Sequence, residues 1–131
     1  MDMAKERSIE AENMINEIKE IVEKCVECGM CKGLCPVFRQ IREETISPRG
    51  KAMILKEGIY DKIVYKCTLC KACEKKCPLN LSLPDAFIKT RAVLVEAGKE
   101  TKENKEMMEK VRQDGNPFGK EIKKGGKLYC C

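Results

Sequence analysis

The sequence predicts an all-α protein in which two cysteine-rich loops are joined by helices. Three observations lead to this fold class. A pattern of four cysteines followed by proline occurs twice, at 25–36 and at 67–78. The segments before, between and after the two patterns carry the apolar periodicity of amphipathic helices and helix-capping residues. The stretch between the patterns is also long enough to hold helices rather than a short turn.

The first helix is expected over 8–24. Its apolar residues recur with helical spacing and form one stripe, while Glu and Lys occupy the remaining positions. The stripe consists of Met14, Ile15, Ile18, Ile21 and Val22. The helix runs directly into Cys25, so we expect its apolar face to pack beside the first cysteine loop.

The segment between the loops contains a helix with recognisable ends. Ser47 and Pro48 are typical of an N-cap and a first helical residue, and Gly58 is typical of a C-terminal stop. A short segment, 59–66, then leads into the second loop. Small bacterial ferredoxins join their cysteine patterns by a short β-rich link, so a helical connection favours an all-α fold that binds two clusters.

Two helices are expected after the second loop. Ser82 and Asp85 resemble a capping box for a helix that ends at Gly98, with its apolar face formed by Phe87, Ile88, Leu94 and Val95. Another helix, over about 101–113, has only Met107, Met108 and Val111 as apolar anchors. We expect one domain over 1–119 and a disordered tail over 120–131, whose Cys130 and Cys131 are assigned to no site.

The cysteine pattern itself indicates the chemistry. Each copy reads C-x-x-C-x-x-C-x-x-x-C-P. Three thiolates spaced by two residues can surround one face of a [4Fe–4S] cluster, and in two-cluster proteins with this spacing the fourth cysteine ligates the other cluster. We therefore expect two crossed [4Fe–4S] clusters. The first would be held by Cys25, Cys28, Cys31 and Cys77, and the second by Cys35, Cys67, Cys70 and Cys73.

Zinc sites and disulfides are the alternatives for these cysteines. Structural zinc sites favour paired C-x-x-C motifs with four ligands, whereas each pattern here has three cysteines in that register and the chain has no His. The charged N-terminus lacks the apolar core of a signal peptide, and no apolar run is long enough to cross a bilayer. A reducing, cytoplasmic location is therefore expected, which disfavours disulfides. A zinc-binding interaction module stays the less favoured interpretation.

The charge of the chain does not indicate nucleic-acid binding. The formal net charge is +5, but each oxidised cluster with its four thiolates adds about −2 and brings the total to about +1. The basic residues are also interleaved with Glu rather than clustered. Arg42, Arg49, Lys51 and Arg91 are interpreted as docking charges around the clusters or, more commonly, as solvated helix faces. Without His and without a phosphate-binding loop, the chain is not expected to catalyse group transfer alone.

Several segments around the patterns resemble the N-terminal iron–sulfur region of heterodisulfide reductase subunits. The same region occurs in the iron–sulfur subunits of glycolate oxidase, of lactate-utilisation complexes and of anaerobic glycerol-3-phosphate dehydrogenase. The resemblance covers about 20–119 and rests on the segments 47–52 (SPRGKA), 65–73 (YKCTLCKAC) and 115–119 (GNPFG), together with the cysteine patterns.

The resemblance implies an α-helical ferredoxin fold, the same eight cysteine ligands and an electron-transfer role within an anaerobic oxidoreductase complex. It implies redox partners, either a flavoprotein or a catalytic subunit with C-C-G motifs, and any association with a membrane complex would be peripheral. Many members continue into a region with C-C-G motifs, whereas this sequence ends at Cys130 and Cys131. The chain is therefore expected to be a short electron-transfer subunit or a truncated part of a longer catalytic subunit for disulfide or hydroxy-acid chemistry.

Overall fold

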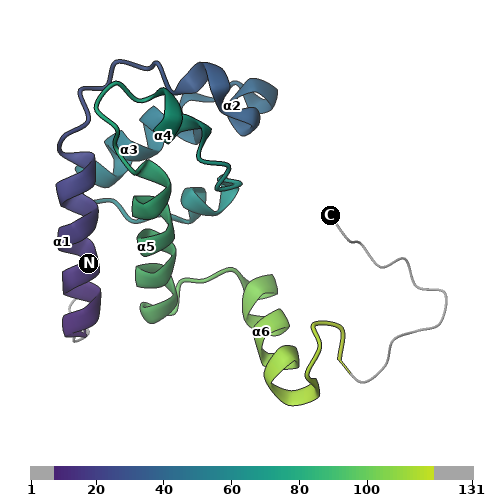
Figure 1. Cartoon of the computed structure of the whole chain (residues 1–131). Helices are drawn as coiled ribbons and strands as arrows, with labels where there is room; N and C mark the ends of the chain where they lie inside the picture. Colours follow the sequence, from purple (N-terminus) through teal and green to yellow (C-terminus); the bar gives the residue numbers. More distant parts are fainter. Residues whose placement is uncertain (1–7, 120–131) are drawn as a thin grey trace. The chain divides into compact units, whose positions relative to one another are not determined.

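The computed structural model describes residues 8–119, and the chain divides into two compact units, one ending at Lys99 and one beginning at Glu100. Every regular element within the described residues is a helix (Figure 1), which confirms the predicted all-α fold class. The predicted tail over 120–131, with Cys130 and Cys131, lies outside the described residues. A single domain over 1–119 stays a prediction.

The first unit contains the two cysteine loops and most of the helices. In chain order its elements are α1 (Ile9–Val22), the 3₁₀ helix η1 (Lys32–Leu34), α2 (Pro36–Ile41), the 3₁₀ helix η2 (Glu44–Ile46), α3 (Pro48–Lys56), the 3₁₀ helix η3 (Lys62–Lys66), α4 (Ala72–Lys76) and α5 (Leu83–Glu96). The second unit contains α6 (Lys102–Asp114). None of the helices in the described part of the chain combines the length and apolar character needed to cross a membrane.

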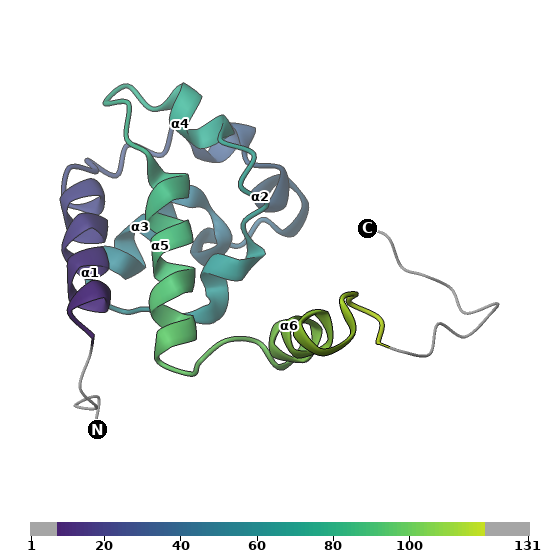
Figure 2. The same ribbon diagram turned by 60° about the horizontal axis from the view of Figure 1, so that its bottom comes forward.

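Helix α1 forms where the apolar stripe predicts it. The Ser8 hydroxyl caps it by accepting a hydrogen bond from the Ala11 N–H at 3.2 Å. The stripe is buried at Ile15, Ile18 and Val22 and packs against α5, which lies beside α1 in both views (Figures 1 and 2). The helix ends slightly earlier than expected, because the chain turns after Val22 to enter the first cysteine loop.

The core of the first unit lies between α1, α3 and α5 and reaches the second cysteine loop. It contains Ile15, Ile18, Val22, Ala52, Leu55, Val64, Cys73, Leu81, Leu83, Ala86, Phe87, Val93 and Leu94. Phe87 and Leu94 are the largest contributions from α5, as expected for its apolar face. The core therefore adjoins the cysteines directly, because Cys73 is one of its members.

The predicted apolar face of α5 is only half correct. Ile88 and Val95 are each 45% exposed, because each lies about one quarter-turn beyond Phe87 or Leu94, past the edge of the buried face. Thr90 is buried in their place, and its hydroxyl donates to the Ala86 carbonyl at 2.7 Å, which satisfies it inside the helix. The predicted capping box is also not formed by side chains, since Ser82 makes no side-chain cap bond.

The apolar anchors predicted for α6 do not form a core within the described residues. Met107, Met108 and Val111 are each between 41% and 42% exposed. The helix nevertheless ends where its sequence indicates, with Gly115 in the left-handed conformation at φ 71°. Local signals therefore determine the extent of this helix without a buried apolar face.

Helix α3 is held close to η2 by its first turn. The Ser47 hydroxyl accepts a hydrogen bond from the Gly50 N–H at 2.9 Å, as the predicted cap requires. A Cβ at Gly50 would lie 1.9 Å from the Glu44 carbonyl oxygen, so the two segments can meet only where position 50 has no side chain. The next residue, Lys51, is buried.

We expect Gly50→Ala to destabilise the first unit strongly. The new methyl group would overlap backbone, which cannot give way as a side chain can, so a loss of about 1–3 kcal/mol or more is expected. For a unit of this size each kcal/mol corresponds to roughly 4–8 °C in Tm, which anaerobic thermal unfolding would measure. Gly33→Ala is the matched control, since a Cβ there meets nothing within 4 Å. Equal Tm values for the two variants would contradict this packing.

Candidate metal centres

The two cysteine loops follow the same backbone path. In each loop the second and the fourth residue after the first cysteine have left-handed φ angles. These are Glu27 (59°) and Gly29 (77°) in the first loop, and Leu69 (57°) and Lys71 (60°) in the second. Three of the four are not glycine, so the left-handed bends cost free energy that other interactions must offset. The repeated pattern of cysteines therefore produces a repeated conformation.

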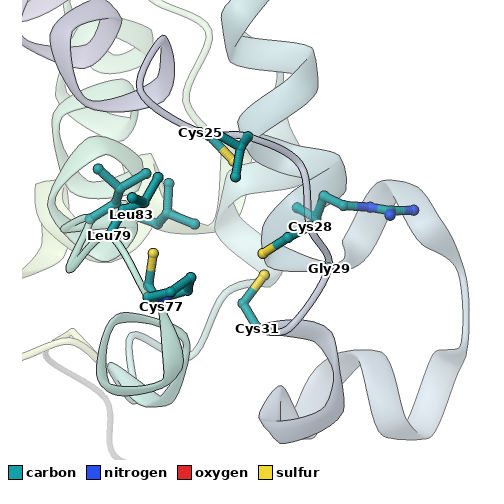
Figure 3. Close-up of a pocket in the computed structure, with 11 residues that line it drawn as sticks. Cys25, Cys28, Gly29, Cys31, Cys77, Leu79 and Leu83 are labelled. Atoms are coloured by element: carbon teal, nitrogen blue, oxygen red, sulfur yellow. The ribbon is translucent and has the colours of Figure 1, made fainter.

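The first cavity brings together cysteines from both loops. Cys25, Cys28 and Cys31 line it from the first loop, and Cys77 lines it from the end of the second. Figure 3 shows Cys28 and Cys31 projecting from their loop and Cys77 facing them across the space, beside Leu79 and Leu83. The remaining wall is formed by Val26, Gly29, Arg49, Pro78 and Leu81.

The second cavity has the reciprocal composition. Cys67, Cys70 and Cys73 line it from the second loop, and Cys35 lines it from the end of the first. Its other lining residues are Val37, Pro48, Lys51, Thr68, Lys71, Pro84 and Phe87. All eight cysteines singled out in the sequence thus line one of two cavities, four in each, and their role as cluster ligands stays a prediction. None of the residues lining either cavity is acidic.

The cysteines differ in exposure between the two cavities. Each cavity has one exposed cysteine, Cys28 in the first and Cys70 in the second. The second cavity is otherwise more enclosed, because Cys35 and Cys73 are buried, whereas no cysteine of the first cavity is. The sulfur atoms line the cavities without converging on a point: within residues 8–119 no three Cys, Asp or Glu side chains are grouped closely enough to hold one metal ion.

Burial sets the protonation of two of these thiols. It raises the pKa of Cys73 to about 12, and neighbouring thiol groups, Cys67 first, add to the effect. Burial is also the main cause of the raised pKa of the Cys31 thiol. Both thiols are therefore protonated at neutral pH until a metal displaces the protons, since thiolate is the ligand form.

Backbone N–H groups reach two of the sulfur atoms. The Phe38 N–H donates to Cys35 Sγ at 3.5 Å, where Cys35 caps α2, and the Leu69 N–H donates to Cys67 Sγ at 3.4 Å. Such hydrogen bonds stabilise thiolates and contribute to the potential of an iron–sulfur centre. Both donors belong to residues that follow their cysteine by two or three positions in the chain.

Lys51 is the residue of the second cavity that sequence reasoning misplaced. It is 1% exposed, so it is neither a docking charge nor part of a solvated helix face. Its Nζ donates to the Ile46 carbonyl oxygen and lies 5.8 Å from the centroid of the Phe87 ring. Burial lowers its pKa from the usual value, and the nearby thiol groups of Cys67, Cys35 and Cys73 oppose that shift when they are ionised. The sequence contained no signal for this burial, because the close contact at Gly50 is seen only in the folded structure.

Arg91 is also more specific than a surface charge. Its guanidinium donates to the Val64 carbonyl at 2.8 Å and to the Cys67 carbonyl at 2.5 Å, and it stacks on the Tyr65 ring with a centroid distance of 5.4 Å. It therefore ties α5 to the start of the second cysteine loop.

The basic residue that lines the first cavity, Arg49, forms an ion pair, unlike Lys51 in the second cavity. Arg49 Nε donates to Glu44 Oε1 at 2.8 Å, and Lys32 Nζ lies 2.7 Å from the second carboxylate oxygen. The hydrogen bond from Lys32, followed by that from Arg49, lowers the pKa of Glu44. Because Arg49 also donates to the Glu27 carbonyl at 3.4 Å, this ion-pair network links the first cysteine loop to η2 and α3.

We expect Glu44→Gln to weaken the attachment of the first loop. The side chains of Lys32, Arg49 and Glu44 are 25%, 29% and 43% exposed, so the loss is expected to be only about 0.5–1 kcal/mol and smaller at high salt. Since the folded-state pKa is lowered, this contribution is complete above the usual pKa of 4.5 and is lost as pH falls below it. Thermal unfolding at low and high salt would measure it, with the exposed neighbour Glu43→Gln as control. A salt-independent loss would contradict the ion-pair explanation.

Comparison with known proteins supports the chemistry of these cavities. Residues 21–81 match the family model of the 4Fe-4S dicluster domain, and all eight lining cysteines fall within the matched region. A search of curated proteins found no match. The four cysteine sulfurs in each apolar-walled cavity also suit an iron–sulfur cluster, whose ligands are thiolates. The matched region therefore supports an iron–sulfur, ferredoxin-like family, the binding of 4Fe-4S clusters and a role in electron transfer.

Proposed function

We propose that this chain is an electron-transfer subunit that relays single electrons through two [4Fe–4S] clusters within an oxidoreductase complex. The observation that carries the proposal is the presence of two cavities, each lined by four cysteines and by no acidic residue. The match to the 4Fe-4S dicluster domain supports the cluster type. A bound cluster of this kind supplies reversible one-electron redox chemistry.

The proposed ligands are crossed between the two halves of the pattern. Cys25, Cys28, Cys31 and Cys77 would hold the first cluster, and Cys35, Cys67, Cys70 and Cys73 the second. The grouping of the cavity walls supports this assignment, because each wall takes three cysteines from one loop and the last cysteine from the other.

The chain's own residues would control access and potential. Leu79, Leu81 and Leu83 shield one side of the first cavity from water, and Phe87 does so in the second. Cys28 and Cys70 are exposed, so they are the points at which a redox partner can come closest to each centre. Electrons would enter beside one of these cysteines and leave beside the other.

The finer identity of the complex is part of the same proposal. We infer a cytoplasmic, anaerobic complex similar to heterodisulfide reductase or to the hydroxy-acid and glycerol-3-phosphate dehydrogenases, on the resemblance of the segments 47–52, 65–73 and 115–119. The redox partner would be a flavoprotein or a C-C-G-type catalytic subunit. Substrate turnover by the purified chain alone would contradict the electron-transfer role in favour of a catalytic one.

We expect anaerobically purified protein to contain about eight irons and eight sulfides per chain, because two [4Fe–4S] clusters are proposed. Metal and sulfide analysis would measure this, and low-temperature spin resonance after reduction would count the centres. About four irons would contradict the second cluster. A colourless, zinc-loaded chain would contradict the proposal altogether and favour a zinc-binding interaction module.

The crossed assignment predicts which pairs of cysteine substitutions spare a cluster. Cys35→Ala with Cys67→Ala removes two ligands of one proposed centre, so one intact [4Fe–4S] cluster should remain. Cys35→Ala with Cys25→Ala removes one ligand from each centre, so both should be impaired. Iron content and spin resonance would distinguish the two variants. The opposite result, with one intact cluster only in the second variant, would show that each loop holds its own cluster. Cys130→Ala is the control and should retain both.

A further inference from the structure

The wall of the second cavity contains a buried cation with no carboxylate partner. Lys51 lies on α3, is 1% exposed and lines this cavity together with Cys35, Cys67 and Cys73. In the described part of the chain its polar contact is with the Ile46 carbonyl, and no ion pair with an acidic side chain is formed. Lysines are almost never fully buried unless they are paired, because an ammonium loses its hydration in the interior. The structure therefore calls for a negative counter-charge in the cavity.

The first cavity has no equivalent of this residue. Its lining cation, Arg49, is paired with Glu44, and the side chains of both are partly in water. The electrostatic potential of a charge that is paired and solvated is screened at a distance, whereas a charge removed from water is screened much less. Glu74, the acidic residue next to Cys73, is not among the residues that line the second cavity. The two cavities thus have alike donor sets but different electrostatic surroundings.

The second cavity also has the greater need for a cation. Cys35 and Cys73 are 9% and 6% exposed, whereas the first cavity has no buried cysteine. A [4Fe–4S] centre with four thiolates carries about −2 when oxidised and about −3 when reduced. Burial disfavours the added negative charge, so enclosure alone would make the second centre harder to reduce. A nearby ammonium opposes that effect.

We propose that the buried ammonium of Lys51 serves as the counter-charge of the second centre and keeps that centre reducible. The inference rests on the proposed two-cluster function. Its geometric basis is the hydrogen bond from Nζ to the Ile46 carbonyl and the position of Nζ over the Phe87 ring, 5.8 Å from the centroid, which hold the charge in the cavity wall. Because the first cavity has no such dry cation, the effect is confined to one of the two centres.

The test is the reduction potential of each centre in Lys51→Gln. Glutamine can still donate to the Ile46 carbonyl but carries no charge, so packing and charge are separated. Anaerobic potentiometric titration followed by spin resonance should show the equilibrium constant for reduction of the second centre falling at least tenfold, which is about 59 mV for one electron. The first centre should not change. Lys51→Arg keeps the charge and should retain most of the original potential.

The two centres are distinguished with the double variant Cys35→Ala, Cys67→Ala, which is expected to retain only the proposed first centre. Arg49→Gln is the matched control in the first cavity and should leave the second centre unchanged. An unchanged second centre in Lys51→Gln, or equal shifts of both centres, would overturn the counter-charge role. If the second cluster is lost in Lys51→Gln and Lys51→Met but kept in Lys51→Arg, the charge is required for binding, which supports the proposal. Loss in all three variants would show that packing alone is involved and would overturn it.

These outcomes are separable from failure of the proposed function. If the unsubstituted chain lacks two clusters, the two-cluster function itself is wrong. If both clusters are present and the potential is insensitive to Lys51, only the counter-charge inference fails.

Discussion

The packing of helices from opposite ends of the first unit determines where the cysteines meet. Helix α1 leads directly into Cys25, and α5 begins shortly after Cys77, so the contact between these two helices brings the start of one loop to the end of the other. In the same way, η1 lies against α4, and the residue after η1 is Cys35 while α4 contains Cys73. The buried apolar side chains of the two long helices are therefore the interaction that brings the two loops together at the first cavity.

This dependence explains why so small a core can position eight cysteines. The apolar residues need only fix the contact between α1 and α5, because each loop then presents three cysteines to its cavity from one short segment with the same left-handed bends. The last cysteine of each pattern is followed by proline, which begins α2 after Cys35 and turns the chain after Cys77. Local backbone constraints thus determine the shape of each loop, and long-range packing determines where the loops meet. Both are needed to form the cavities.

The sequence was most informative where a residue's role is set by its neighbours in the chain. The Ser47–Pro48 cap and the Gly58 stop mark α3 correctly, and the cysteine patterns mark the two loops whose cysteines line the cavities. It was least informative where tertiary contact overrides local character. From the sequence Lys51 is interpreted as a solvated lysine, because the close contact between Gly50 and the Glu44 carbonyl is apparent only in the structure. Similarly, Ile88 and Val95 read as core residues, because periodicity alone does not reveal how wide a face the neighbouring helix covers.

The matching bends of the two loops bear on how such a site could be moved into another protein. The left-handed positions are occupied by Glu27, Gly29, Leu69 and Lys71, which share no side-chain chemistry. The shape is therefore set by the main chain and the cysteine register rather than by one kind of side chain, although a non-glycine residue at a left-handed position costs free energy. A designer could treat the turn as a transferable module and choose the intervening side chains for the host surface, provided that the host supplies a fourth thiol from elsewhere.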